Sequence, residues 1–227
     1  MIIVPYNVDV PMERYPIANW VIILFTCIIS FNAFGSMAVG APVERWMLHG
    51  GGEWASDAAL IGATLTHGDL FHLIGNMIFL FVFGNAVNAK LGHATYIAVY
   101  FGLGVVSSYI YAFTSDGPAL GASGAIAGIS GMFIVFFPKN NVSVFYWIGW
   151  FFRGVWRVSS WIVLGLFFAK DVIFQILDSA MIGGVAYMAH IGGTVVGVAL
   201  AVALLAADRV RATKYEVTLP EMMGIRL

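Results

Sequence analysis

The sequence predicts an all-α membrane protein, folded as one bundle of six transmembrane helices with both chain ends in the cytoplasm. Composition is the first observation: the 227 residues are 60% hydrophobic and only 10% charged, with a mean hydropathy of +0.89, which no ordinary soluble domain matches. The second is a set of apolar segments of roughly 20 residues, the length at which a helix crosses the hydrocarbon. The third is the gathering of Lys and Arg in alternate connections, which indicates the orientation.

The elements follow in chain order. Residues 1–16 carry no signal-peptide or transit-peptide pattern and are expected to form a cytoplasmic N-terminal segment. Six apolar segments come next, at 17–39, 70–89, 94–113, 122–137, 158–177 and 184–206, of which the fourth is short. The stretch 142–152 is too short to cross alone, and its Tyr146, Trp147 and Trp150 suit the membrane interface. The expected organisation is therefore an N-terminal segment (1–16), a six-helix intramembrane domain (17–207) and a cytoplasmic C-terminal tail (208–227).

Basic residues indicate which side of the membrane each connection occupies. Those expected on one side are Arg14, Lys90, Lys139, Arg153, Arg157, Arg209, Arg211, Lys214 and Arg226. The opposite connections hold Arg45 alone. Because basic loops stay in the cytoplasm, both termini are expected there. The long first loop, 40–69, then faces outward and lies partly in the interface with Trp46 and Trp54, and the expected location is a cell membrane, plasma or inner.

Three polar residues inside apolar segments are candidates for function, because polar groups in lipid are costly. With a rise of about 1.5 Å per residue, Ser123, Asn76 and His190 all fall roughly 20–24 Å above the cytoplasmic ends of their helices. They therefore lie at one level in the outer half of the membrane. His72 is four residues before Asn76 and shares its helix face.

Small residues surround the serine and the histidine. Gly121, Gly124 and Gly128 crowd beside Ser123, while Gly193 and Gly197 follow His190 at helical spacing. Small residues let membrane helices approach through their backbones. The fourth and sixth helices are thus expected to pack closely enough for a hydrogen bond between Ser123 and His190.

A serine beside an imidazole is typical of nucleophilic catalysis, since the base takes the hydroxyl proton and later returns it to the leaving group. His72 and Asn76 offer N–H donors for an oxyanion. No carboxylate occurs in the segment of His190, and Asp116 and Asp178 are expected in loops, so a Ser–His dyad is favoured over a triad.

Other classes of function have less support. The net charge of −1 gives no reason to expect nucleic acid as a partner, and Cys27 has no second cysteine to pair with. The histidines have no carboxylate or cysteine at ligand spacing, so neither a metal nor another cofactor is expected. Lys170 and Asp171 lie inside the fifth segment, and the sequence assigns them no role.

Three strings together resemble the rhomboid family of intramembrane serine proteases: His-Gly-Asp-Leu-Phe-His-Leu-Ile-Gly-Asn at 67–76, Gly-Ala-Ser-Gly at 121–124 and Ala-His-Ile-Gly-Gly at 189–193. The resemblance implies a six-helix rhomboid fold, with Ser123 as nucleophile and His190 as general base. It further implies that His72, Asn76 and the backbone amide of Ser123 stabilise the oxyanion. The implied partners are the lipid bilayer and single-span membrane proteins, which are cut near the outer end of their helix.

Two positions depart from that family's pattern. Trp54 is followed by Ala55 rather than arginine, and Ala127 stands where some members place an aromatic residue against the catalytic histidine. Tyr187 and Met188 are candidates for orienting His190 instead, and His67 either gates or anchors the first loop or sits at the interface. The alternatives are a catalytically inactive relative that binds and escorts membrane proteins and, less favoured, a small transporter, for which no internal repeat is seen.

Overall fold

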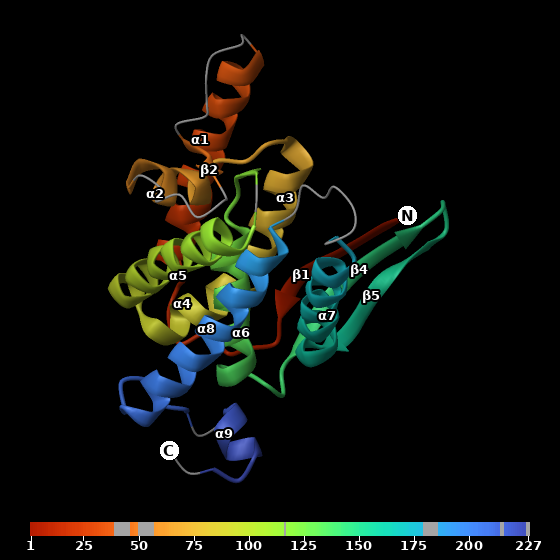
Figure 1. Ribbon diagram of the computed structural model, residues 1–227. Helices are drawn as coiled ribbons and strands as arrows, with labels where there is room; N and C mark the ends of the chain where they lie inside the picture. The colour runs from red at the N-terminus through yellow and green to blue at the C-terminus, as the bar shows by residue number, and fades with distance from the viewer. Residues whose placement is uncertain (39–45, 50–56, 116, 179–185, 214–215, 226–227) are drawn as a thin grey trace.

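The computed structural model describes residues 1–38, 46–49, 57–115, 117–178, 186–213 and 216–225, and folds them as a helical bundle with a small sheet at one end (Figure 1). The helices are α1 (Ile17–Ala38), α2 (Asp57–Leu65), α3 (Leu70–Phe79), α4 (Asn85–Leu91), α5 (His93–Thr114), α6 (Ser123–Phe136), α7 (Ser160–Asp178), α8 (Tyr187–Ala206) and α9 (Leu219–Met222). The strands are β1 (Ile2–Val8), β2 (Leu48–His49), β3 (Pro118–Ala119), β4 (Asn141–Ile148) and β5 (Phe152–Ser159).

Five of the described helices are long and apolar enough to cross a membrane: α1, the continuous α3–α4 rod over Leu70–Leu91, α5, α7 and α8. The chain is therefore a multi-pass membrane protein. The fourth predicted span is the exception, because α6 has only 14 residues and reaches about 21 Å against a hydrocarbon core of about 30 Å. Ser107 of α5 lies against Gly124 at the start of α6, and α5 continues for another seven residues to Thr114, or roughly 10 Å. Helix α6 therefore begins below that end of α5.

The α3–α4 rod contains one π-helical turn, Leu80–Gly84, that explains a buried polar cluster. A π turn disturbs the regular ladder of backbone hydrogen bonds. Asn19 of α1 donates from its side-chain amide to the Leu80 carbonyl at 2.9 Å and to Asn85 Oδ1 at 2.8 Å. The hydroxyl of Tyr96 in turn donates to Asn19 Oδ1 at 2.6 Å. This cluster ties α1, α4 and α5 together.

The close packing expected between the fourth and sixth helices is present, because α6 and α8 touch backbone to backbone. A Cβ added at Gly193 would lie 2.3 Å from the carbonyl oxygen of Gly124, and one added at Gly197 would lie 2.0 Å from that of Gly128. Both distances are far below van der Waals contact. No side chain larger than hydrogen fits at either position without separating the helices.

A three-stranded antiparallel sheet, in the order β1-β4-β5, corrects the expectation of an all-α protein. The expected N-terminal segment forms β1, which pairs with β4, and the interfacial stretch 142–152 forms most of a hairpin. The hairpin turns at Gly149, whose φ of 63° lies in the region that glycine tolerates. Strands of β-branched and aromatic residues on either side of such a turn favour this structure.

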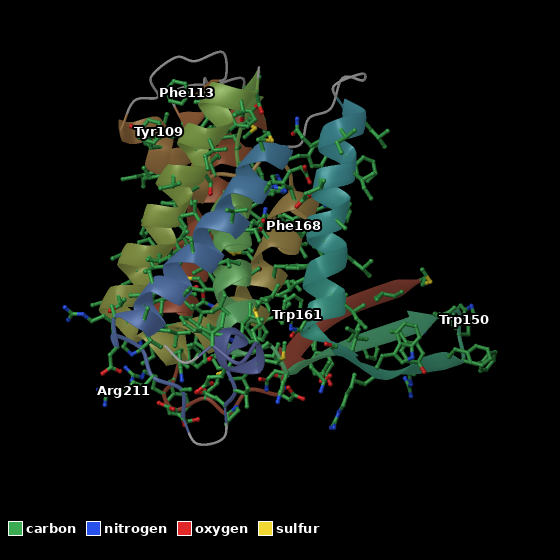
Figure 2. The ribbon with its side chains drawn as sticks, turned by 60° about the horizontal axis from the view of Figure 1, so that its bottom comes forward. Tyr109, Phe113, Trp150, Trp161, Phe168 and Arg211 are labelled. Carbon is green, nitrogen blue, oxygen red and sulfur yellow. The ribbon has the colours of Figure 1, made fainter. Side chains whose placement is uncertain are left out.

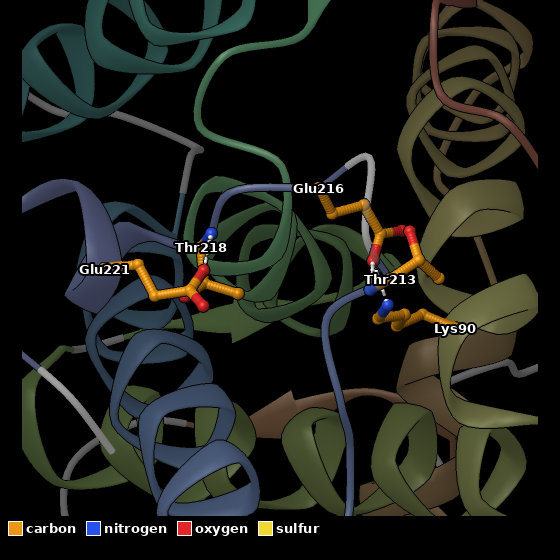
Figure 3. A network of polar contacts seen from close by, with 5 residues as sticks. All are labelled: Lys90, Thr213, Glu216, Thr218 and Glu221. Carbon is orange, nitrogen blue, oxygen red and sulfur yellow. Dashed lines mark hydrogen bonds and ion pairs between the residues drawn. The ribbon is translucent and has the colours of Figure 1, made fainter.

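The C-terminal segment lies against the end of the bundle nearest the sheet (Figures 1 and 3). Glu216 forms an ion pair with Lys90 at the end of α4, and both side chains are almost completely buried. Glu216 also accepts a hydrogen bond from the backbone N–H of Thr213 at 2.7 Å. Thr218 and Glu221 form a capping box that starts α9. The predicted tail thus packs on the bundle at Val210, Thr218 and Pro220, while residues 221–225 are exposed.

The first loop is described only in part. Trp46 packs its ring against Gly62 of α2, and β2 pairs with β3 just before the turn into α6. The expected roles of Arg45, Trp54 and Ala55, the first residues of the predicted sixth span (184 and 185), and the charges of Lys214 and Arg226 lie outside the described residues. Placement of this loop in the membrane interface stays a prediction.

Candidate active site

Ser123 and His190 meet across the α6–α8 contact. Nε2 of His190 lies 2.7 Å from Oγ of Ser123, which is hydrogen-bonding distance. Ser123 is the first residue of α6, and His190 lies in the first turn of α8. The glycines at 124, 128, 193 and 197 bring the two helices close enough for this contact. A hydroxyl against an imidazole nitrogen is the arrangement in which a serine becomes nucleophilic.

The other ring nitrogen of His190 faces a carboxylate that the sequence analysis left without a role. Asp171 Oδ2 on α7 lies 3.2 Å from Nδ1 of His190, and both side chains are largely buried. The expectation of a site with no carboxylate on the histidine is therefore wrong. Asp171 supplies the orienting contact that Tyr187 was considered for. The ring of Tyr187 meets that of His190 edge-on, at 6.5 Å between centroids.

A signal in the sequence could have found Asp171. It stands 11 residues into α7, or roughly 17 Å above the start of that helix, close to the level estimated for Ser123 and His190. An ionisable residue inside a membrane helix is a functional candidate by default.

Lys170 partly balances the charge of Asp171. Its Nζ lies 3.1 Å from Asp171 Oδ1 and also sits over the ring of Phe167, 5.3 Å from the centroid. The lysine side chain is 44% exposed, whereas that of Asp171 is 10% exposed. The histidine is thus the more enclosed partner of the carboxylate.

Hydrogen-bond donors gather next to the serine. His72 and Asn76 lie on one face of α3, and the Asn76 amide donates to the His72 carbonyl at 3.2 Å, which leaves its second hydrogen available. Gly121 approaches them so closely that an added Cβ would lie 2.7 Å from Cε1 of His72, and its φ of 124° also requires glycine. The first amides of α6, Ser123 among them, have no partner within the helix. Side-chain and backbone donors therefore converge where an oxyanion would form.

His67 is buried and holds the turn that precedes the serine. Its Nε2 accepts the backbone N–H of Ala122 at 3.5 Å, and its Nδ1 lies 3.0 Å from the hydroxyl of Ser30 on α1. Burial, with a smaller contribution from the neighbouring His72, lowers the pKa of His67 to about 3. A neutral ring that accepts at Nε2 carries its proton on Nδ1. The contacts of His67 thus reach both α1 and the residue before α6, and its expected role in gating or anchoring the first loop stays a prediction.

A cavity of about 730 Å³ opens beside these groups, between α3, α6, α7 and α8. Ser123, His190 and Asp171 lie in its wall, which is otherwise mostly apolar, with Trp161 and Phe168 contributed by α7 (Figure 2). Ala127 also lines it, so the position where an aromatic residue was considered is open space. At its far end the cavity reaches Leu219 of α9. The polar groups thus adjoin a space suited to apolar chains.

Comparison with known proteins identifies the family. A model of the rhomboid domain matches residues 52–207. "Rhomboid protein 1, mitochondrial" of Saccharomyces cerevisiae is 27% identical over 69% of this chain and 44% of its own length. "Presenilin-associated rhomboid-like protein, mitochondrial" of Homo sapiens is 28% identical over 60% of this chain and 35% of its own. "Putative rhomboid protease YdcA" of Bacillus subtilis is 35% identical over 37% of this chain and 41% of its own. The matched region spans less than half of each of these relatives.

Proposed function

The chain belongs to the rhomboid family, and from that premise we propose that it is an intramembrane serine endopeptidase. The single observation that carries the proposal is the 2.7 Å contact between Ser123 Oγ and His190 Nε2. The proposed catalytic residues are these two, with Asp171 as the residue that positions the histidine. A catalytically inactive escort or a transporter has no need of this contact.

In the proposed reaction, Oγ of Ser123 attacks the scissile carbonyl carbon while its proton passes to Nε2 of His190. Asp171 keeps the Nδ1 proton in place, so that Nε2 is the free base, and stabilises the imidazolium that forms. When the tetrahedral intermediate collapses, the imidazolium gives its proton to the leaving amine and an acyl-enzyme remains. Water, deprotonated by the same imidazole, then releases the second product and restores the serine.

The oxyanion of each tetrahedral intermediate is proposed to lie between α3 and the start of α6. The donors available to it are the His72 ring, the free hydrogen of the Asn76 amide and the backbone N–H of Ser123. In a site enclosed by apolar walls such donors act strongly, and the loss of one costs on the order of 3 kcal/mol. The near contact between Gly121 and His72 supports this placement, because it keeps the imidazole beside the nucleophile.

The proposed substrates are single-span membrane proteins cut near the outer end of their helix. The apolar cavity beside Ser123 supports an apolar chain as ligand, and the start of α6 below the surface supports cleavage near an interface that water can reach. A helix hides its carbonyls in hydrogen bonds, so the substrate has to unwind locally. Residues that weaken helices are therefore expected near the cleaved bond.

The proposed membrane is a plasma or inner cell membrane, with both termini on its cytoplasmic side. The yeast and human relatives carry "mitochondrial" in their printed names, so a mitochondrial membrane is the alternative. Fractionation of cells that express the tagged chain, with markers for both compartments, decides between them.

The test of the activity uses native protein and the Ser123→Ala variant in lipid nanodiscs, with a single-span substrate whose outer helix end contains glycine or proline. Native protein is expected to release two fragments, and the folded variant none. A fluorophosphonate is expected to label native protein alone. Equal cleavage by both proteins would overturn the proposal, since it would place the activity in a contaminant.

A further inference from the structure

The β1-β4-β5 sheet takes no part in the proposed chemistry, yet the two faces of its β4–β5 hairpin differ: one is wholly apolar, aromatic or glycine, and the other mixes Arg153 and Arg157 with Phe145, Trp147 and Val155. Paired residues of antiparallel strands share a face, so the register places the even-numbered residues of β4 and β5 on one face and the odd-numbered residues on the other. Every even-numbered residue from 142 to 148 and from 152 to 158 is apolar, aromatic or glycine. We call this the apolar face. The odd-numbered face carries Arg153 and Arg157 and is called the arginine face.

The inner half of the apolar face packs against the bundle. Val142 and Val144, with Val8 from β1, belong to the main hydrophobic core and are 0%, 7% and 3% exposed. The apolar face therefore looks toward the helices, and the arginine face looks away from them. The outer half of the apolar face has no such cover: Phe152 is 72% exposed and Trp156 45%.

Helix α7 stands next to this uncovered half. Strand β5 ends at Ser159 and α7 begins at Ser160, without a connecting loop. Figure 2 shows the sheet running sideways from the lower end of α7, with Trp150 at its far tip. Ile162 and Leu166 of α7 are 56% and 66% exposed, as expected of a helix in lipid. The exposed apolar residues of the sheet and of α7 thus form the two sides of a corner. In a membrane the acyl chains around α7 would fill this corner.

Charge and backbone chemistry place the sheet at the interface rather than deeper. From Lys139 to Ala169 the chain holds three basic residues and no acidic one, which favours contact with anionic lipid headgroups. Strands β1 and β5 are the edges of the sheet, and open edges need water or headgroups as hydrogen-bond partners. Aromatic residues such as Trp150 and Trp156 favour the same region.

We propose that the β1-β4-β5 sheet is an amphipathic anchor in the headgroup region of the leaflet at the end of the bundle that carries the C-terminal segment. The outer half of its apolar face lies against acyl chains, and Arg153 and Arg157 face lipid phosphates and water. The expected depth is roughly 5–10 Å into the boundary between headgroups and chains, as for interfacial helices. Because β5 continues directly into α7, the anchor also holds the lower end of the helix that carries Asp171.

The test places nitroxide labels on both faces of the full-length protein. On a Cys27→Ser background, Ile148→Cys and Phe152→Cys label the apolar face, and Trp147→Cys and Val155→Cys label the arginine face. Each variant is reconstituted at one molecule per nanodisc of phosphatidylcholine and phosphatidylglycerol, after size exclusion and circular dichroism have shown that it is folded. Collision of each label with oxygen and with a water-soluble nickel complex is measured by electron paramagnetic resonance.

Labels on the apolar face are expected to collide several-fold less with nickel, and more with oxygen, than labels one or three residues away in the same strand on the arginine face. Equal, high nickel collision at all four sites would show a sheet projecting into water and would overturn the proposal. Protection of all four from both reagents would also overturn it, because protein rather than lipid would then cover the sheet. Neither result depends on whether the protein cleaves a substrate.

Discussion

At the scale of single residues, Asp171 is held in an unfavourable place by two partners. A carboxylate within a membrane helix is costly unless it is paired, and here one oxygen faces Nδ1 of His190 at 3.2 Å and the other faces Lys170 at 3.1 Å. The histidine contact is the enclosed one, while Lys170 is 44% exposed. A partly exposed ion pair contributes little. The carboxylate is therefore retained chiefly for its effect on the imidazole.

The variant Asp171→Asn is expected to lower kcat by on the order of 10²–10⁴-fold. The amide NH₂ introduced at position 171 can donate to Nδ1 of His190, which favours the tautomer protonated on Nε2. In that tautomer Nε2 can no longer accept the proton of Ser123. Cleavage rate against pH is the measurement, together with the rate of fluorophosphonate labelling and the melting temperature. Lys170→Gln serves as the matched control and is expected to stay close to native. If Asp171→Asn has the same pH–rate profile as native protein, Asp171 has no role in the mechanism.

At the scale of elements, the α6–α8 contact is the most demanding piece of packing. Gly197→Ala puts a methyl group 2.0 Å from the Gly128 carbonyl oxygen, and this overpacking is expected to cost about 1–3 kcal/mol of stability. Gly102→Ala in α5 is the control, because an added Cβ there meets nothing within 4 Å. Melting temperatures in detergent are compared. Equal effects of the two substitutions would mean that α6 and α8 are farther apart than described.

The ion pair between Lys90 and Glu216 attaches the C-terminal segment to the bundle, and its burial gives a distinctive prediction. Lys90→Met leaves a buried carboxylate unpaired and is expected to destabilise the fold by about 3–5 kcal/mol. The double variant Lys90→Met, Glu216→Met removes both charges and is expected to recover most of that loss. Melting temperature and proteolysis of the C-terminal segment measure both effects. Additive losses in the double variant would argue against a buried pair.

We predict that strand β1 becomes less stable in acid, because the carboxylate of Asp9, which follows this strand, becomes protonated. Partial burial alone would raise the pKa of Asp9, but hydrogen bonds from Asn141 and Asn140 outweigh it and hold this pKa below the ordinary 3.8. A carboxylate with a lowered folded pKa stabilises fully above its unfolded pKa, and the stabilisation disappears as pH falls through the lowered value. Hydrogen exchange of the β1 amides is expected to be faster in Asp9→Asn than in native protein at pH 7, and the difference is expected to shrink as pH falls below 3.8 and through the lowered pKa of Asp9. A difference that does not change with pH would contradict this assignment.

At the scale of the whole molecule, hydropathy predicted most of the bundle, because lipid constrains membrane helices strongly, while the family was predicted from the resemblance of the strings at 67–76, 121–124 and 189–193. The same constraint explains what was missed. The lipid constraint does not apply to residues 141–159, which fold at the end of the bundle as a hairpin. By hydropathy this stretch is only an apolar segment too short to cross the membrane. Asp171 was missed for another reason: its depth in α7 indicates the level of the site, but its contact with His190 depends on the distance between α7 and α8, which no pattern within a single segment contains.

Orientation is the remaining property of the whole chain, and it determines the side on which the cleaved product leaves. In Figure 2 the sheet, which includes the N-terminal strand β1, extends from the end of the bundle at which Arg211 of the C-terminal segment lies. Arg153 and Arg157 lie in this sheet, and Lys90 pairs with Glu216 of the C-terminal segment. The positive-inside rule therefore predicts that green fluorescent protein fused to either terminus fluoresces in bacterial cells, while alkaline phosphatase fused to either terminus is inactive. Ser123, near the opposite end of the bundle, would then cut in the outer half of the membrane and release the outer fragment. If alkaline phosphatase is active at both termini, the orientation of the chain is the opposite of the one predicted. The proposed site would then lie in the cytoplasmic half of the membrane, and the cleaved product would be released into the cytoplasm.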